Sequence, residues 1–259
     1  MAHFSYTQMD TFIKCPEKYR FRYIEKIRMP AGAELLRGDA YHKGVAYGYS
    51  GVIAYHKYPS LDEVLQVYSD AWNKRAKEQI INEDDAELTV PAITFGDKKP
   101  GEMKDEGAVV LTKYYNEVLT KTIPDRVEKR FTTVYHGISL LSYVDLIQWD
   151  GTVVDHKTGK KSYSDDEIER EMQSSFYAIS MGFNQIKHFE IHQAVIKKEP
   201  EIKIIQISRT PDDIEWVGKL IDKSWDTIQR GSFCPSTTGW WCSKSFCEYW
   251  GFCKMPSSF

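Results

Sequence analysis

The feature that most constrains the fold is a change in the spacing of apolar residues near Val127. Before this point apolar residues recur at helical spacing, for example at Val64, Tyr68 and Trp72. After it, apolar and polar residues alternate over 127–135 and 138–148, and a shorter apolar run follows at 152–157. The sequence therefore predicts an α/β fold, with a helical first half, three consecutive strands and helices that cover the sheet.

The other elements follow from caps and breakers. We expect helices at 5–14, 16–27, 38–48, 60–80, 104–122, 164–182 and 210–231, strands at 188–197 and 202–208, and a loop over 83–101. Within one domain, 1–259, we distinguish N-terminal helices (1–48), a helical insertion (49–124), an α/β core (125–231) and an irregular Cys-rich tail (232–259).

The composition narrows the class of protein. The chain has 259 residues, and its 34 Lys and Arg against 37 Asp and Glu give a net charge of −3. This balance argues against a protein that coats nucleic acid non-specifically, but it does not exclude a local basic groove. No apolar run approaches the roughly 20 residues that span a bilayer, and the first ten residues lack the pattern of a secretory signal. We therefore expect a cytoplasmic protein with no membrane contact.

The turn at Asp150-Gly151 decides which side chains face each other across the hairpin. A two-residue turn places Asp145 opposite His156. A three-residue turn with Gly151 in the left-handed region instead places Asp145 directly opposite Asp155. We expect the second register, because glycine tolerates that backbone conformation.

Asp145 and Asp155 are charged residues within otherwise apolar strands, and Lys157 shares a strand face with Asp155. Two facing carboxylates repel each other unless a cation lies between them, and hard oxygen ligands suit Mg²⁺ or Mn²⁺. A neighbouring lysine can stabilise developing negative charge or help to activate a water molecule. The alternative is a pair of solvent-facing aspartates beside a surface lysine.

The cysteines are placed unevenly along the chain. Cys15 stands alone at a predicted helix break, whereas Cys234, Cys242, Cys247 and Cys253 lie in the last 26 residues. An odd number in a cytoplasmic chain argues against a disulfide framework. Soft thiolates bind either an iron–sulfur cluster or zinc, and a group held by both ends of the chain would join them.

Basic residues mark two candidate surfaces for nucleic acid. Arg20 and Arg22 lie in a basic stretch interleaved with aromatic residues, a composition that suits a phosphate-tracking groove. An ordinary amphipathic helix would have the same pattern. Lys160 and Lys161 directly follow the strand that carries Asp155, so we expect them to meet phosphate near the metal.

Five elements in one order resemble a known family. They are Gly38-Asp-Ala-Tyr-His42, Asp145, Asp155-His156-Lys157, Gln173-Ser-Ser-Phe-Tyr177, and the set Cys15, Cys242, Cys247 and Cys253. The chain resembles the PD-(D/E)XK nucleases, and among them the RecB-like exonucleases that carry an iron–sulfur cluster. CRISPR-adaptation nucleases and many phage exonucleases belong to that group.

The resemblance implies a restriction-endonuclease-like core and a role for each motif. His42, Asp145, Asp155 and the backbone at His156 would hold Mg²⁺ or Mn²⁺. Lys157 would position or activate the attacking water. Gln173 and Tyr177 would orient the site and contact the DNA strand. The four cysteines would hold a [4Fe–4S] cluster, with structural zinc as the alternative and Cys234 outside the set. Glu128 is a weaker candidate for supporting the site.

The implied function is metal-dependent exonuclease action on DNA, with single-stranded ends and 5′→3′ polarity expected. The setting would be recombination, repair, phage DNA metabolism or CRISPR adaptation, in a bacterial or phage-infected cell. A recombination or integrase partner and a homo-oligomer are compatible with the family. The alternative is a non-catalytic module that binds DNA ends or recruits a partner. The intact Asp145, Asp155 and Lys157 favour the enzyme.

Overall fold

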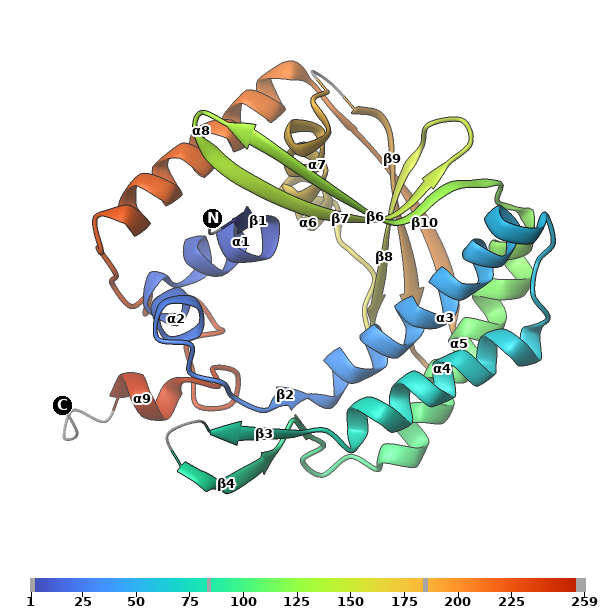
Figure 1. Cartoon of the computed structure of the whole chain (residues 1–259), viewed down its shortest axis with the longest axis horizontal. Helices are drawn as coiled ribbons and strands as arrows, with labels where there is room; N and C mark the ends of the chain where they lie inside the picture. The colour runs from blue at the N-terminus through green and yellow to red at the C-terminus, as the bar shows by residue number, and fades with distance from the viewer. Residues whose placement is uncertain (1–2, 83–84, 184–185, 255–259) are drawn as a thin grey trace.

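A mixed β-sheet forms the centre of the computed structural model, which describes residues 3–82, 85–183 and 186–254 (Figure 1). The strands are β1 (Phe4–Ser5), β6 (Pro124–Tyr135), β7 (Ile138–Gln148), β8 (Val153–Gly159), β9 (Ile186–Val195) and β10 (Glu201–Arg209). Their order is β1-β7-β8-β9-β10, and β6 also pairs with β7. Strands β6, β7 and β8 run antiparallel, whereas β8 and β9 are parallel, as the crossover through intervening helices requires.

Helices cover the sheet and extend beyond it. They are α1 (Tyr6–Lys14), α2 (Pro16–Tyr19), a π-helical turn (Arg20–Ile24), α3 (Ala33–Tyr55), α4 (Leu61–Ala76), α5 (Pro100–Glu117), a 3₁₀ turn (Leu119–Lys121), α6 (Asp165–Glu169), α7 (Gln173–Met181), α8 (Pro211–Gln229) and α9 (Trp250–Lys254). Two small sheets pair β2 (Ala31–Gly32) with β5 (Ile93–Thr94) and β3 (Gln79–Asn82) with β4 (Asp85–Pro91).

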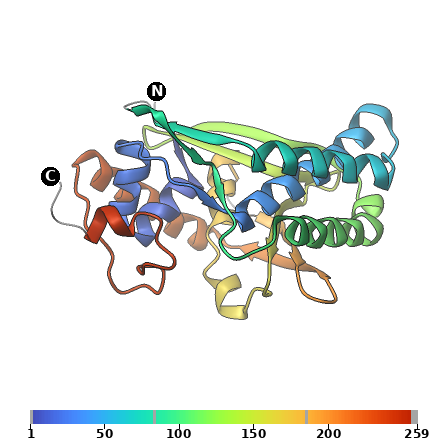
Figure 2. The same ribbon diagram turned by 90° about the horizontal axis from the view of Figure 1, so that it is seen from below.

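Each face of the sheet has its own apolar core. Leu140 and Val144 of β7 point toward α1, α7 and α8. Leu146 of β7 and Val154 of β8 point the other way, into a core built with α3, α4 and α5. The neighbouring residues Ile147 and Val153 belong to the first core, because successive strand side chains alternate between faces, so each strand serves both cores. The helices α3–α5 gather at one end of the molecule, and both chain termini lie at the other (Figures 1 and 2).

Several predicted boundaries are wrong. The expected loop 83–101 contains β4, β5 and the start of α5, and α3 runs through the division expected between residues 48 and 49. The expected helix 164–182 is broken between α6 and α7. The guanidinium of Arg209 fills the break, because it donates to the carbonyl oxygens of Ile168 and Glu171 at 2.9 and 2.7 Å. The helix expected to reach Ile27 ends earlier, and Lys26 adopts a positive φ of 58°.

None of the helices within the described ranges is both long enough and apolar enough to cross a membrane.

Candidate active site

The β7–β8 hairpin has the predicted register. Gly151 adopts a φ of +87°, and the N–H of Gln148 donates to the carbonyl oxygen of Thr152 at 2.9 Å. The pairs Ile147–Val153 and Leu146–Val154 continue this register toward Asp145 and Asp155. The prediction of a three-residue turn with a left-handed glycine is therefore confirmed.

Beyond Leu146 and Val154 the two strands stop pairing, and β1 pairs with β7 at Leu140 and Leu141 instead. Asp145 lies where β7 and β8 diverge. The N–H of His156, which has no ladder partner on β7 there, donates to Asp145 Oδ2 at 2.7 Å. Because the strands diverge here, the N–H of His156 hydrogen-bonds to the carboxylate of Asp145 and not to a carbonyl oxygen of β7.

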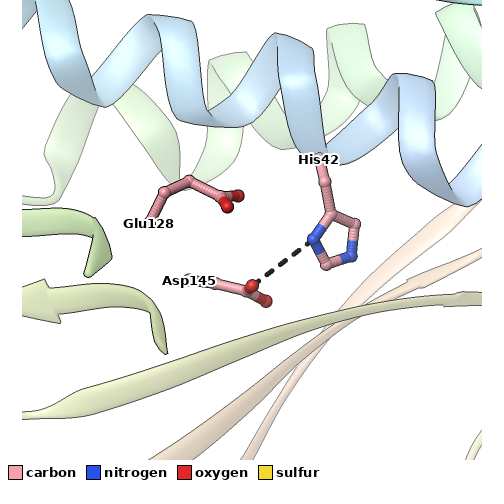
Figure 3. Close-up of side chains that lie close together, drawn as sticks. All are labelled: His42, Glu128 and Asp145. Carbon is pink, nitrogen blue, oxygen red and sulfur yellow. Dashed lines mark ion pairs between the residues drawn. The ribbon is translucent and has the colours of Figure 1, made fainter. Parts of the chain in front are cut away.

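His42, Glu128 and Asp145 come from three elements and point toward one another (Figure 3). One ligand atom from each lies within 4.8 Å of the other two, and His42 Nδ1 is 3.5 Å from Asp145 Oδ1. One nitrogen and two carboxylate oxygens at this spacing suit a hard divalent cation. This group coincides with the predicted metal residues His42 and Asp145 and adds Glu128.

Gly38 explains how His42 reaches the sheet. A Cβ atom at this position would lie 3.3 Å from Thr158 Oγ1 of β8, so the glycine allows α3 to approach the strand closely. His42 follows four residues later on the same face of α3. The spacing of the Gly38–His42 motif therefore has a packing reason.

Glu128 lies on β6 with a φ of +48°, a left-handed conformation that is unusual for a residue with a side chain. Burial and the nearby negative charge of Asp145 raise the pKa of its carboxyl group. In the sequence Glu128 is only a weaker candidate, because an exposed strand residue would fit the same position, and strand alternation gives no sign of its left-handed backbone.

The charge state of Asp145 is set by its two histidine neighbours. Burial alone would favour the protonated form. Hydrogen bonds from His156 and His42 outweigh that effect and hold the pKa of Asp145 well below its usual range. Asp145 is therefore an ionised carboxylate, ready to bind a cation at neutral pH.

Asp155 does not face the group of His42, Glu128 and Asp145 with a free carboxylate. Its Oδ2 lies 2.7 Å from Lys157 Nζ, and its Oδ1 accepts a hydrogen bond from Gln173 Nε2 at 2.7 Å. Burial, together with the charge of Asp145 and against the opposing charge of Lys157, raises the pKa of Asp155 to about 6. For Lys157, the attraction of Asp155 outweighs burial and raises the pKa further above its usual value.

Gln173 and Tyr177 lie one turn apart on α7 and hold this pair in place. Gln173 accepts a hydrogen bond from Lys157 Nζ at 2.9 Å and donates to Tyr177 Oη at 2.6 Å. The hydroxyl of Tyr177 donates to the carbonyl oxygen of Tyr143 on β7 at 2.8 Å. The two predicted motif residues therefore connect α7 to both divergent strands.

The cysteines of the two chain ends line one cavity of about 270 Å³. Its walls include Cys15, Cys242, Cys247 and Cys253, and not Cys234, which is exposed. The tail is fastened to the N-terminal helices, because Tyr249 Oη donates to the carbonyl oxygen of Ile27 at 2.9 Å and Lys18 pairs with Glu248 at 2.9 Å. The N-terminal helices and the Cys-rich tail therefore lie side by side, as expected.

The basic candidates differ in how far they are engaged by other residues. Arg20 forms ion pairs with Glu17 and Glu25, whereas Arg22 lies against the ring of Tyr23 and is exposed. Lys160 and Lys161 are exposed at the end of β8. Of the two arginines, Arg22 is thus the freer to meet phosphate.

The sequence model of the PD-(D/E)XK nuclease superfamily matches residues 3–254, and the chain belongs to this superfamily. A crystal structure of a candidate exonuclease from Eubacterium rectale aligns with a TM-score of 0.60 and 12% identity, over 99% of this chain and 90% of that one. That similarity shows a shared fold, and it confirms the predicted restriction-endonuclease-like core.

A structure of SSO0001 aligns with a TM-score of 0.38 and 11% identity, over 88% of this chain and 97% of that one. No curated protein matches this chain.

Proposed function

We propose that this protein is a divalent-metal-dependent DNA exonuclease that hydrolyses phosphodiester bonds from single-stranded ends, with 5′→3′ polarity. The observation that carries the proposal is the convergence of His42, Glu128 and Asp145 beside the Asp155–Lys157 pair. This group borders a cavity of about 820 Å³, large enough for a nucleotide. Mg²⁺ or Mn²⁺ fits the nitrogen and oxygen donors, and Asp155 would join the ligand set by turning from Lys157.

When bound, the cation would polarise the scissile phosphate and lower the pKa of the attacking water. His42, Glu128 and Asp145 would hold it, and the ionised Asp145 would provide most of the attraction. Lys157 retains its proton, because its pKa is raised. Its ammonium group would therefore position the water and offset the negative charge that develops on phosphorus, rather than remove a proton.

The route of the strand follows from a second cavity. This cavity, of about 680 Å³, shares Leu35 and Arg75 with the metal cavity and is lined by the exposed cations Arg22, Arg28 and Lys244. We infer that the strand passes from the metal along Arg75 toward these cations, with Lys160 and Lys161 on the other side. Arg28→Ala should weaken DNA binding and reduce its salt dependence, whereas Arg20→Ala should change binding little because Glu17 and Glu25 already engage that side chain.

The cysteine cavity is proposed to hold a [4Fe–4S] cluster that fastens the tail. Four cysteines from the two end regions of the chain line this one cavity. Their soft thiolates suit an iron–sulfur cluster or zinc, and the family resemblance favours the cluster.

The direct test is cleavage of end-labelled single-stranded DNA by anaerobically purified protein, with and without Mn²⁺. We expect metal-dependent trimming by the wild type and its loss in Lys157→Ala. The position of the label gives the polarity. DNA binding without cleavage under every metal would overturn the proposal in favour of a DNA-end-binding module.

Recombination, repair, phage DNA metabolism and CRISPR adaptation all remain settings for this activity. Purification from its own cell with a co-eluting integrase or recombination protein would separate them.

A further inference from the structure

A chain of side-chain contacts leads from Asp145 on β7, past His156 on β8 and Tyr114 on α5, to His192 and Glu190 on β9. His156, on β8, contacts Asp145 with its backbone N–H at 2.7 Å and places its ring Nδ1 3.6 Å from the same oxygen, Oδ2. The other ring nitrogen, Nε2, lies 2.9 Å from the hydroxyl of Tyr114. That hydroxyl lies 2.7 Å from Nδ1 of His192 on β9, and Nε2 of His192 lies 2.9 Å from a carboxylate oxygen of Glu190.

Tyr114 is the centre of this chain and is fully buried. It lies on α5, in the helical region for which the family resemblance offered no role. A third partner, the hydroxyl of Tyr49 on α3, lies 2.9 Å from the Tyr114 hydroxyl. Three neighbours therefore surround an oxygen that has a single proton to give.

We infer that Tyr114, His192 and Glu190 are positioning residues: they hold the ring proton of His156 on Nε2, away from Asp145, so that the backbone N–H of His156 alone holds Oδ2 of Asp145. The inference rests on the proposed metal site. It gives α5 a function in that site, because Tyr114 contacts His156, the neighbour of Asp145.

Counting protons sets the direction of the chain. The carboxylate of Glu190 can only accept, so a neutral His192 carries its proton on Nε2 and leaves Nδ1 as an acceptor. The hydroxyl of Tyr114 then donates to His192 Nδ1. Its remaining lone pairs can only accept, so Tyr49 and His156 both donate to it. A neutral His156 therefore carries its proton on Nε2, away from Asp145.

In this arrangement the two carboxylate oxygens of Asp145 have different roles. Oδ2 is held by the backbone N–H of His156, whose ring is fixed by Tyr114. Oδ1 faces His42 and the metal group. Because Oδ2 is held from behind, Oδ1 keeps one direction toward the cation. Outer partners that orient ligands in this way typically change metal affinity by about 10- to 100-fold.

The test compares Tyr114→Phe with Tyr41→Phe. Tyr41 is a matched control, because it is fully buried, its ring centroid is 5.9 Å from that of Tyr114, and its hydroxyl has no hydrogen-bond partner within the described ranges. Mn²⁺ affinity is measured by calorimetry, and the tautomer of His156 by ¹⁵N NMR. We expect Tyr114→Phe to weaken Mn²⁺ binding roughly tenfold and to release the His156 tautomer, and Tyr41→Phe to change neither.

The outcomes separate the two proposals. Unchanged Mn²⁺ affinity and unchanged His156 nitrogen signals in a folded Tyr114→Phe protein overturn the relay. Absence of Mn²⁺ binding in the wild type overturns the metal site, while the NMR signals still judge the relay. If Tyr114→Phe does not fold, Glu190→Ala removes the half-buried end of the chain and should alter the signals of both histidines. An unaltered pattern there overturns the relay.

Discussion

Gln173 Nε2 donates to Oδ1 of Asp155 at 2.7 Å while Lys157 Nζ lies 2.7 Å from Oδ2 of the same carboxylate. Gln173 Oε1 also accepts from Lys157 at 2.9 Å. One amide on α7 thus touches both members of the pair on β8. It fixes their geometry without itself carrying charge.

Replacement of Gln173 by Ala should therefore disturb catalysis more than folding. We expect kcat for DNA cleavage to fall roughly 10- to 100-fold, because the Lys157 ammonium loses its orientation. Ser175→Ala, two residues along the same helix, is the control and should leave kcat unchanged. Single-turnover cleavage measures the effect. An unaltered rate in Gln173→Ala would assign the motif to packing alone.

Two substitutions at Glu128 should separate its chemistry from its backbone. Glu128→Gln removes the charge and keeps the left-handed backbone, so Mn²⁺ affinity should fall while stability is retained. Glu128→Gly also loses affinity, but it removes the steric cost of a positive φ, which is about 1 kcal/mol. Its metal-free form should therefore unfold at a higher denaturant concentration than the wild type. Wild-type Mn²⁺ affinity in Glu128→Gln would exclude this residue from the metal site.

Metal affinity should rise as pH increases through about 6. Burial raises the pKa of Asp155 to about 6, and Asp145, against the opposing effect of burial, raises the pKa of His42. Below that pH a cation must displace protons from these groups, so binding at pH 5.5 should release more protons than binding at pH 7.5. Calorimetry in buffers of different ionisation enthalpy counts them, and equal release at both values would contradict the expectation.

The same shift predicts a trend in the stability of the metal-free protein. A carboxyl group whose pKa is raised on folding contributes stability that is fully present below its unfolded pKa and lost as pH rises through the folded value. Because of Asp155, the free energy of unfolding of the metal-free protein should fall as pH rises from about 4 to about 6. Denaturant unfolding across this range measures the trend.

The cysteine cavity predicts a selective loss of the visible chromophore. Cys15→Ser should abolish the iron–sulfur absorbance and lower thermal stability, because the proposed cluster would no longer join the tail to α1 and α2. Cys234→Ser should change neither property, since that exposed side chain lies outside the cavity. Stoichiometric zinc in the purified wild type, with no visible absorbance, would favour the alternative metal.

Much of the core could be predicted from local rules. Alternation and the tolerance of Gly151 for positive φ indicated the hairpin register, which runs through Ile147–Val153 and Leu146–Val154 toward Asp145 and Asp155. The helices expected to start near residues 5, 60 and 210 do so, and each has a capping box, at Ser5, Ser60 and Thr210. These features depend on residues close in sequence, and they can therefore be predicted from the sequence.

What the tertiary structure alone decided depends on contacts between distant segments. The divergence of β7 from β8 arises because β1 takes part of the edge of β7, and the break after α6 is filled by Arg209 from β10. The left-handed Glu128 and the Tyr114 chain behind Asp145 depend on how β6 and α5 pack. By itself the sequence indicated His42, Asp145, Asp155, Lys157, Gln173 and Tyr177 as candidate site residues. Their distances were decided by packing, because the free energy that orients them comes from neighbours far away in the chain.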